Sequence, residues 1–74
     1  MSDDVELVTI EIRDGAAWLT LNQPDAGNPF TIDSVAALRD AVSAARRADV
    51  GVVVVAARGR SFSVGGDLGS AGQI

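Results

Sequence analysis

The chain has 74 residues, enough for one small domain at most. It contains no cysteine and no histidine, which excludes disulfide bonds and argues against zinc and haem sites. Its net charge of −4 comes from six basic and ten acidic residues without a basic patch, which argues against nucleic acid as a partner.

The composition also predicts the environment of the chain. Apolar residues make up 47% of it, which is typical of a globular protein, and a chain this short is expected to draw stability from partner chains or a further part of its domain. Residues 1–7 form a polar, acidic leader without the features of a signal peptide. The longest apolar run, residues 50–57, is far shorter than the roughly 20 residues of a transmembrane helix. We therefore expect cytoplasmic localisation and no membrane partner.

Residues 8–21 have the pattern of a β-hairpin. Apolar and polar side chains alternate over residues 8–13, and Asp14 and Gly15 form a two-residue turn that tolerates positive φ. The expected core-facing residues of the return strand are Ala17, Leu19 and Leu21.

Residues 22–30 then form an irregular loop, because two prolines, a glycine and two asparagines interrupt any regular element. A loop of this length in a compact domain is often functional, and a plain surface connection is the alternative.

An amphipathic helix is predicted over residues 32–48. Thr31 is a good N-cap, and Asp33 lies in the first turn, where the helix dipole favours an acidic side chain. Arg46 and Arg47 lie at the end that favours cations. Apolar residues recur at helical spacing at Ile32, Val35, Leu38, Val42 and Ala45.

Residues 50–57 are almost all valine or alanine, which predicts a strand that is apolar on both faces. Such strands are typical of the interior of a parallel sheet. The predicted order is strand, strand, helix and strand, followed by a glycine-rich loop and the start of a helix near Asp67. This is an α/β arrangement within a single domain over residues 1–74.

The glycine-rich loop holds paired glycines, Gly65 and Gly66, directly before an acidic residue. Backbone N–H groups exposed there can stabilise a carbonyl oxygen that becomes negative, and a tight turn with positive φ is the alternative. A P-loop is excluded because the chain has no lysine. The Gly-x-Gly-x-x-Gly spacing of a dinucleotide site is also absent.

Two motifs stand out when the loops are read together. Residues 21–25 read Leu-Asn-Gln-Pro-Asp, and residues 59–68 read Gly-Arg-Ser-Phe-Ser-Val-Gly-Gly-Asp-Leu. These motifs resemble the N-terminal part of the crotonase superfamily, the enoyl-CoA hydratase/isomerase family. Between them come an Asn-Pro-Phe sequence, the predicted helix and the valine-rich strand, so the resemblance covers residues 8–68. It implies a crotonase-like core, which is a spiral of ββα turns.

The resemblance also implies roles for single residues. The backbone N–H of Gly66 would be one of two oxyanion-hole donors to a CoA thioester, and the CoA is part of the substrate, with no separate cofactor and no metal. Asp67 is also predicted to cap the helix that begins there. The implied substrate-binding residues are Ala26, Asn28, Ser63, Val64, Gly65, Asp67 and Leu68.

Some residues depart from the family pattern. Gln23 replaces an arginine, Ala26 stands where a basic residue is common, and Pro29 replaces an alanine. Contacts to the nucleotide end of CoA are therefore open, with Arg58 or Arg60 as an alternative contact or as solvated surface residues. We expect Phe62 in the core.

The resemblance implies that the chain is one part of an enoyl-CoA hydratase whose catalytic carboxylates lie outside this chain. The two glutamates, Glu6 and Glu11, lie in the leader and on an expected outer face, unsuited to acid–base catalysis. An enoyl-CoA isomerase or another crotonase-type enzyme is an alternative, and so is a non-catalytic remnant that binds CoA esters or other family members. The family suggests a homotrimer or hexamer, completed by the remainder of the domain or a companion chain. We expect this chain alone to be inactive and loosely packed.

Overall fold

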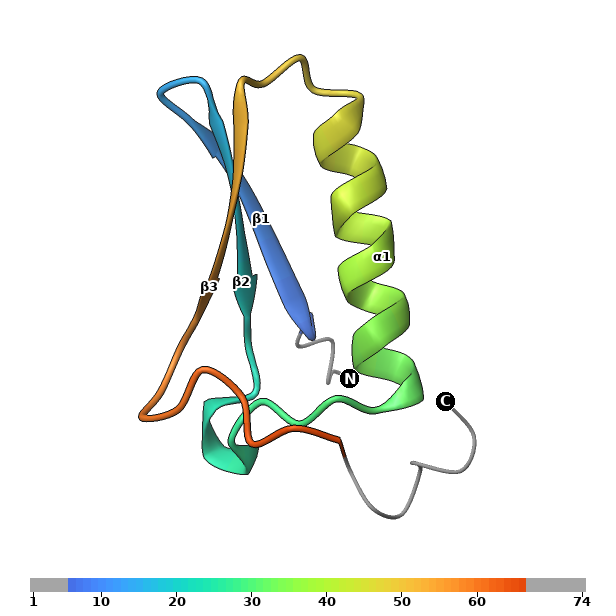
Figure 1. The fold of residues 1–74 in the computed structure, drawn as a ribbon, viewed down its shortest axis with the longest axis vertical. Coiled ribbons are helices and arrows are strands. Elements are labelled where there is room, and N and C mark those ends of the chain that lie inside the picture. The colour runs from blue at the N-terminus through green and yellow to red at the C-terminus, as the bar shows by residue number, and fades with distance from the viewer. Residues whose placement is uncertain (1–5, 67–74) are drawn as a thin grey trace.

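The computed structural model describes residues 6–66 as a sheet with one helix packed on it (Figure 1). Two strands, β1 (Val8–Arg13) and β2 (Ala16–Leu21), precede a short 3₁₀ helix, η1 (Pro24–Ala26). The helix α1 (Ile32–Arg46) and the strand β3 (Val52–Ala57) follow. The three strands lie in the order β1-β2-β3, with β1 antiparallel and β3 parallel to β2.

The predicted hairpin is confirmed, with its turn at Asp14 and Gly15. These residues have φ of 54° and 78°, as a two-residue turn that matches the twist of the strands requires. The pairing runs from Val8 opposite Leu21 to Arg13 opposite Ala16. The other face of the hairpin carries polar and amphipathic side chains, and Arg13 lies over the ring of Trp18 at 4.4 Å.

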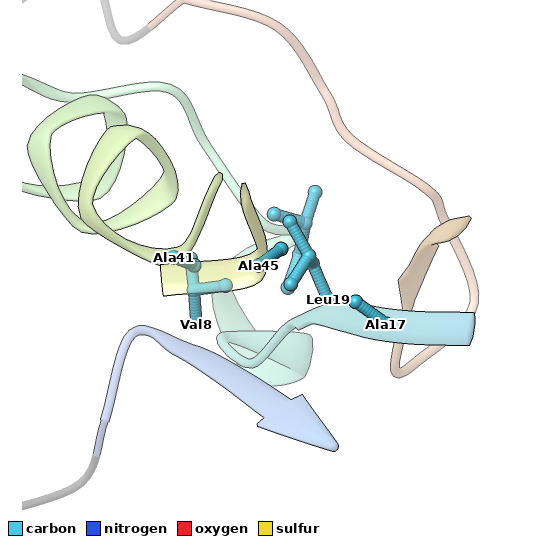
Figure 2. Close-up of a cluster of buried hydrophobic side chains, with 6 residues drawn as sticks. Val8, Ala17, Leu19, Ala41 and Ala45 are labelled. Carbon is cyan, nitrogen blue, oxygen red and sulfur yellow. The ribbon is translucent and has the colours of Figure 1, made fainter. Parts of the chain in front are cut away.

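The core lies between β2 and α1, as the alternation on the return strand predicts. Ala17 and Leu19 are fully buried, and Leu21 is 5% exposed. Figure 2 shows Leu19 pointing toward Ala45 on the helix, with Val8 close to Ala41. The small alanine side chains let the helix approach the sheet closely, so one large residue, Leu19, fills the centre of the core.

The helix begins at the predicted residue with a capping box. The Ser34 N–H donates to Thr31 Oγ1 at 3.0 Å, and the Thr31 N–H donates to Ser34 Oγ at 2.8 Å. Asp33 lies in the first turn and Arg46 in the last, as expected. The helix ends at Arg46, two residues before the predicted end.

The predicted apolar stripe of the helix is only partly correct. Leu38 and Ala45 pack on the core, together with Ala41. Three other members of the stripe are exposed by 37–44%, namely Ile32, Val35 and Val42. The reason is that a sheet of three strands covers only one row of the helix, and these residues lie on the neighbouring row.

The strand β3 begins two residues later than predicted and pairs in parallel with β2, as expected. Its expected position in the interior of the sheet is wrong for the described part of the chain, where β3 is an edge strand (Figure 1). Val52, Val53 and Val55 are consequently 54%, 41% and 42% exposed.

The expectation that Phe62 lies in the core is also wrong, because its side chain is 54% exposed. Phe62 follows the end of β3 on a loop that no described helix covers.

The helix α1 has 15 residues, fewer than a helix needs to cross a bilayer, and no helix in residues 6–66 is long and apolar enough to do so.

Candidate functional site

Two loops meet at the carboxyl ends of the parallel strands β2 and β3. The 22–30 loop follows β2 and the 58–66 loop follows β3, and Leu21 and Ala57 are paired at the strand ends. Figure 1 shows the two loops side by side below the sheet. In open α/β sheets, ligands bind in the region outside the carboxyl ends of the strands, so this is the natural place for a site.

Asn28 joins the two loops through its side-chain amide. Its Nδ2 donates to the carbonyl oxygens of Arg58 at 2.8 Å and Ser61 at 3.1 Å, and its Oδ1 accepts from the Gln23 N–H at 2.8 Å. The residue is 3% exposed and has a φ of 52°, a left-handed conformation that asparagine tolerates well. Both the nitrogen and the oxygen of the side-chain amide are thus hydrogen-bonded to backbone groups.

Ser63 makes a second connection between the loops. Its hydroxyl donates to the carbonyl oxygen of Asn28 at 2.8 Å and accepts from the Gly65 N–H at 2.9 Å. Because a serine hydroxyl has one proton to donate, that donor is occupied by Asn28. The hydroxyl therefore links the 58–66 loop to the 22–30 loop, and it also links Ser63 to Gly65 within the 58–66 loop.

Backbone hydrogen bonds complete the contact between the loops. The Val64 N–H donates to the Gly27 carbonyl at 2.9 Å, and the Phe30 N–H donates to the Gly65 carbonyl at 2.9 Å. Phe30 and Gly66 form an isolated parallel bridge. The loops therefore run together as a short ladder that ends at the paired glycines.

Two glycines permit this close approach. A Cβ atom on Gly59 would lie 2.8 Å from Cβ and 3.0 Å from Cα of Pro24, and a Cβ atom on Gly27 would lie 2.7 Å from a methyl carbon of Val64. Both glycines also have positive φ, 98° at Gly59 and 79° at Gly27. At Gly59 a larger residue would collide with the rigid ring of Pro24, whereas at Gly27 the exposed Val64 side chain would have to shift and the backbone would be strained.

The peptide unit between Gly65 and Gly66 has a defined direction. Its carbonyl oxygen accepts from the Phe30 N–H, and no peptide bond within residues 6–66 is cis. In a trans peptide the C=O and N–H groups point in opposite directions, so the Gly66 N–H points away from the 22–30 loop. Within residues 6–66 this N–H has no hydrogen-bond acceptor, and Gly66 is exposed.

The chain is similar to known proteins in both sequence and structure. No family model matches the chain. A trans-2-decenoyl-[acyl-carrier-protein] isomerase of Streptococcus mutans is 36% identical over 66 residues, which are 88% of this chain and 25% of the isomerase. The crystal structure of an enoyl-CoA hydratase from Thermoplasma volcanium is similar with a TM-score of 0.85 and 31% identity, over 95% of this chain and 28% of that one.

An enoyl-CoA hydratase/isomerase from Mycobacterium paratuberculosis has a TM-score of 0.78 and 33% identity, over 84% of this chain and 25% of that one. The resemblance to the crotonase family is thus confirmed in both sequence and structure. The crotonase-like α/β fold expected from the sequence is therefore confirmed. The chain spans about a quarter of the length of the crotonase-family proteins that it matches.

The structure brings together most of the residues that the crotonase resemblance selects. Asn28, Ser63, Val64, Gly65 and Gly66 lie in the ladder between the loops. Ala26 ends the short helix η1 on the same loop and is exposed. Asp67, with its predicted helix cap, and Leu68 lie outside the described residues. The roles of these residues in binding and catalysis stay predictions.

The sequence pattern did not reveal how the loops are joined. The Asn28 side chain binds Arg58 and Ser61, which follow it by 30 and 33 positions in the sequence. The Ser63 hydroxyl binds Asn28, which precedes it by 35 positions. The glycines in both loops indicated that backbone segments come close together, but they did not indicate which segments those are. Arg58 and Arg60 are exposed, and their role stays a prediction. In residues 6–66, no group of three or more His, Cys, Asp or Glu residues is placed to hold a metal ion.

Proposed function

We propose that this chain forms part of an active site for an enoyl thioester, in which the Gly66 N–H is one oxyanion-hole donor. The observation that supports this most is the peptide unit between Gly65 and Gly66, whose carbonyl is bound to Phe30 and whose N–H points out of the ladder. A donor held in a fixed direction stabilises the negative charge that develops on a thioester oxygen when an enolate forms.

The thioester would lie along the two loops at the carboxyl ends of β2 and β3. Ala26, Val64 and Gly66 are exposed to solvent there, while Asn28 is buried. In this arrangement Asn28 and Ser63 support the binding surface, and Ala26 and Val64 supply its outer part. Asp67 and Leu68, which the crotonase resemblance also selects, lie outside the described residues.

Hydration of a 2-enoyl-CoA is the first candidate reaction. It requires the oxyanion donor described above, a second donor, and carboxylates that position water and move a proton. Glu6 and Glu11 are exposed and belong to neither loop, so this chain offers no glutamate for that role within residues 6–66. The catalytic carboxylates and the second donor would come from a further part of the crotonase domain or from a companion chain.

Isomerisation of an enoyl thioester is the second candidate, favoured by the likeness to an acyl-carrier-protein isomerase. Both reactions need the same stabilised thioester oxygen, because both pass through an enolate. Hydration forms the enolate by adding water at C3 and then protonates C2, whereas isomerisation of a 3-enoyl thioester removes a proton from C2 and returns one at C4. Because position 26 carries alanine and not a basic residue, a carrier protein is a second candidate beside CoA as the carrier of the acyl group.

The test is an assay of the polypeptide or complex in which this chain functions, with crotonyl-CoA as the hydration substrate. The loss of the conjugated enoyl thioester absorbance measures hydration, and its appearance from a 3-enoyl-CoA measures isomerisation. Turnover in the first assay supports a hydratase, and turnover only in the second supports an isomerase. A protein that neither turns over nor binds these thioesters would contradict the proposed function.

A further inference from the structure

A connected series of hydrogen bonds leads from the buried amide of Asn28 to the peptide unit that carries the Gly66 N–H. Asn28 is fixed by three hydrogen bonds of its side chain, to Gln23, Arg58 and Ser61. Its carbonyl oxygen accepts the hydroxyl proton of Ser63 at 2.8 Å. The Ser63 oxygen in turn accepts the Gly65 N–H at 2.9 Å. Ser63 is therefore the one side chain between Asn28 and the glycine pair in this series.

Gly65 needs such support from outside. It has a φ of 93°, and a Cβ atom built on it would meet nothing within 4 Å, so no steric contact of its own restricts it. Glycine is the residue with the greatest backbone freedom, and a free glycine would let the following peptide rotate. Here its N–H is bound to Ser63 and its carbonyl to Phe30, which fixes the residue at both ends.

We infer that Ser63 is a positioning residue for the Gly66 N–H, which acts through Gly65 and does not itself contact the thioester. This inference rests on the proposed function. It assigns a role different from the direct substrate contact that the sequence predicts, because the only hydroxyl proton of Ser63 is donated to Asn28. Loss of the hydroxyl would free the Gly65 N–H and allow the adjacent peptide to turn away from the thioester oxygen.

The loop offers a matched set of variants. Ser63→Ala removes the hydroxyl, Ser63→Thr retains it, and Ser63→Cys replaces it with a weakly hydrogen-bonding thiol of similar size. Ser61→Ala is the control, because Ser61 is exposed and contributes its backbone carbonyl, not its side chain, to the Asn28 contact. The variants are made in the polypeptide or complex in which this chain functions.

The decisive readout is the carbonyl stretching frequency of bound butyryl-CoA labelled with ¹³C at the thioester carbon. Butyryl-CoA is saturated and unreactive, and a hydrogen bond to its carbonyl lowers that frequency. We expect the unsubstituted protein, Ser61→Ala and Ser63→Thr to lower it equally. Ser63→Ala should lose most of the effect and Ser63→Cys part of it, while the Kd for butyryl-CoA changes less than about threefold. In turnover, Ser63→Ala should lower kcat about 10- to 100-fold with little change in KM, as expected for a misplaced oxyanion donor.

The outcomes separate this inference from the function on which it rests. If the unsubstituted protein neither binds butyryl-CoA nor lowers its carbonyl frequency, the proposed function is wrong and the inference is overturned with it. If the unsubstituted protein does both, and Ser63→Ala and Ser63→Cys do the same, only the positioning role is overturned. A weaker Kd with an unchanged carbonyl frequency would likewise overturn it in favour of direct contact. Should Ser63→Ala fail to fold, the comparison of Ser63→Cys with Ser63→Thr decides in the same way.

Discussion

The buried amide of Asn28 illustrates how one residue determines the geometry of two loops. Asn28→Asp keeps the shape of the side chain but leaves the carbonyl oxygens of Arg58 and Ser61 facing a buried carboxylate. Each buried polar group without a partner costs about 1–3 kcal/mol, so we expect the free energy of unfolding to fall by at least about 2 kcal/mol. Denaturant unfolding of the intact protein measures this change.

Asn22→Asp is the matched control for that variant. The Asn22 side chain also donates to a backbone carbonyl, that of Glu6 at 2.9 Å, but the bond is exposed to solvent. Water replaces such a bond, and we expect a loss of less than about 1 kcal/mol. Equal losses in the two variants would show that the burial of Asn28 is unimportant.

Gly59 and Gly65 separate the two reasons for which a loop requires glycine. Their φ angles are similar, 98° and 93°, but a Cβ atom at Gly59 would lie 2.8 Å from the rigid ring of Pro24, while one at Gly65 would meet nothing within 4 Å. Gly65→Ala should thus cost only the backbone strain, about 1–2 kcal/mol. Gly59→Ala should cost roughly 1–3 kcal/mol more because of overpacking. Thermal unfolding of both variants measures the difference, and equal stabilities would argue against a tight contact between the loops.

At the level of elements, the start of α1 depends on the reciprocal bonds between Thr31 and Ser34. Thr31→Ala removes the cap oxygen and should lower the free energy of unfolding by about 1 kcal/mol. Thr31→Ser retains the oxygen and should change it by much less. Denaturant unfolding measures both variants. Loss of the same stability in both would mean that the threonine methyl group, not the cap, stabilises this helix end.

The elements themselves were predictable from the sequence because their signals are local. The Asp-Gly turn lies between two alternating segments, Thr31 directly precedes the apolar spacing of α1, and β3 is a run of valines. Their arrangement was less predictable. Which row of α1 faces the sheet, and whether β3 has a neighbour on its second edge, depend on segments far away in the sequence. The same holds for the site, where the glycine pair was visible but the contact between Ser63 and Asn28 was not.

At the scale of the whole molecule, the described chain leaves large apolar residues in contact with solvent. Ile10, Ile12, Val53 and Val55 lie on the face that carries the core, yet each is 41–50% exposed. The apolar strand β3 also has a free edge in residues 6–66. Exposed edges and apolar patches of this kind are covered by partners or cause aggregation.

We therefore expect a polypeptide of these 74 residues, prepared by itself, to aggregate or to remain loosely packed. Size-exclusion chromatography with light scattering and a thermal scan measure this behaviour. A monomer with a sharp, cooperative unfolding transition would show that the exposed valines of β3 need no partner. In the functional assembly, we expect a native mass larger than that of this chain, because the free edge and exposed valines of β3 call for a partner.

The most direct test of the account is a comparison of Gly66→Pro with Gly66→Ala in the functional assembly. Proline removes the N–H proposed as the oxyanion donor, whereas alanine retains it and adds a Cβ atom that meets nothing within 4 Å. We expect kcat/KM for the enoyl thioester to fall about 100- to 1000-fold in the proline variant and to change little in the alanine variant, with the native mass unchanged in both. Equal turnover by the two variants at the same native mass would contradict this expectation.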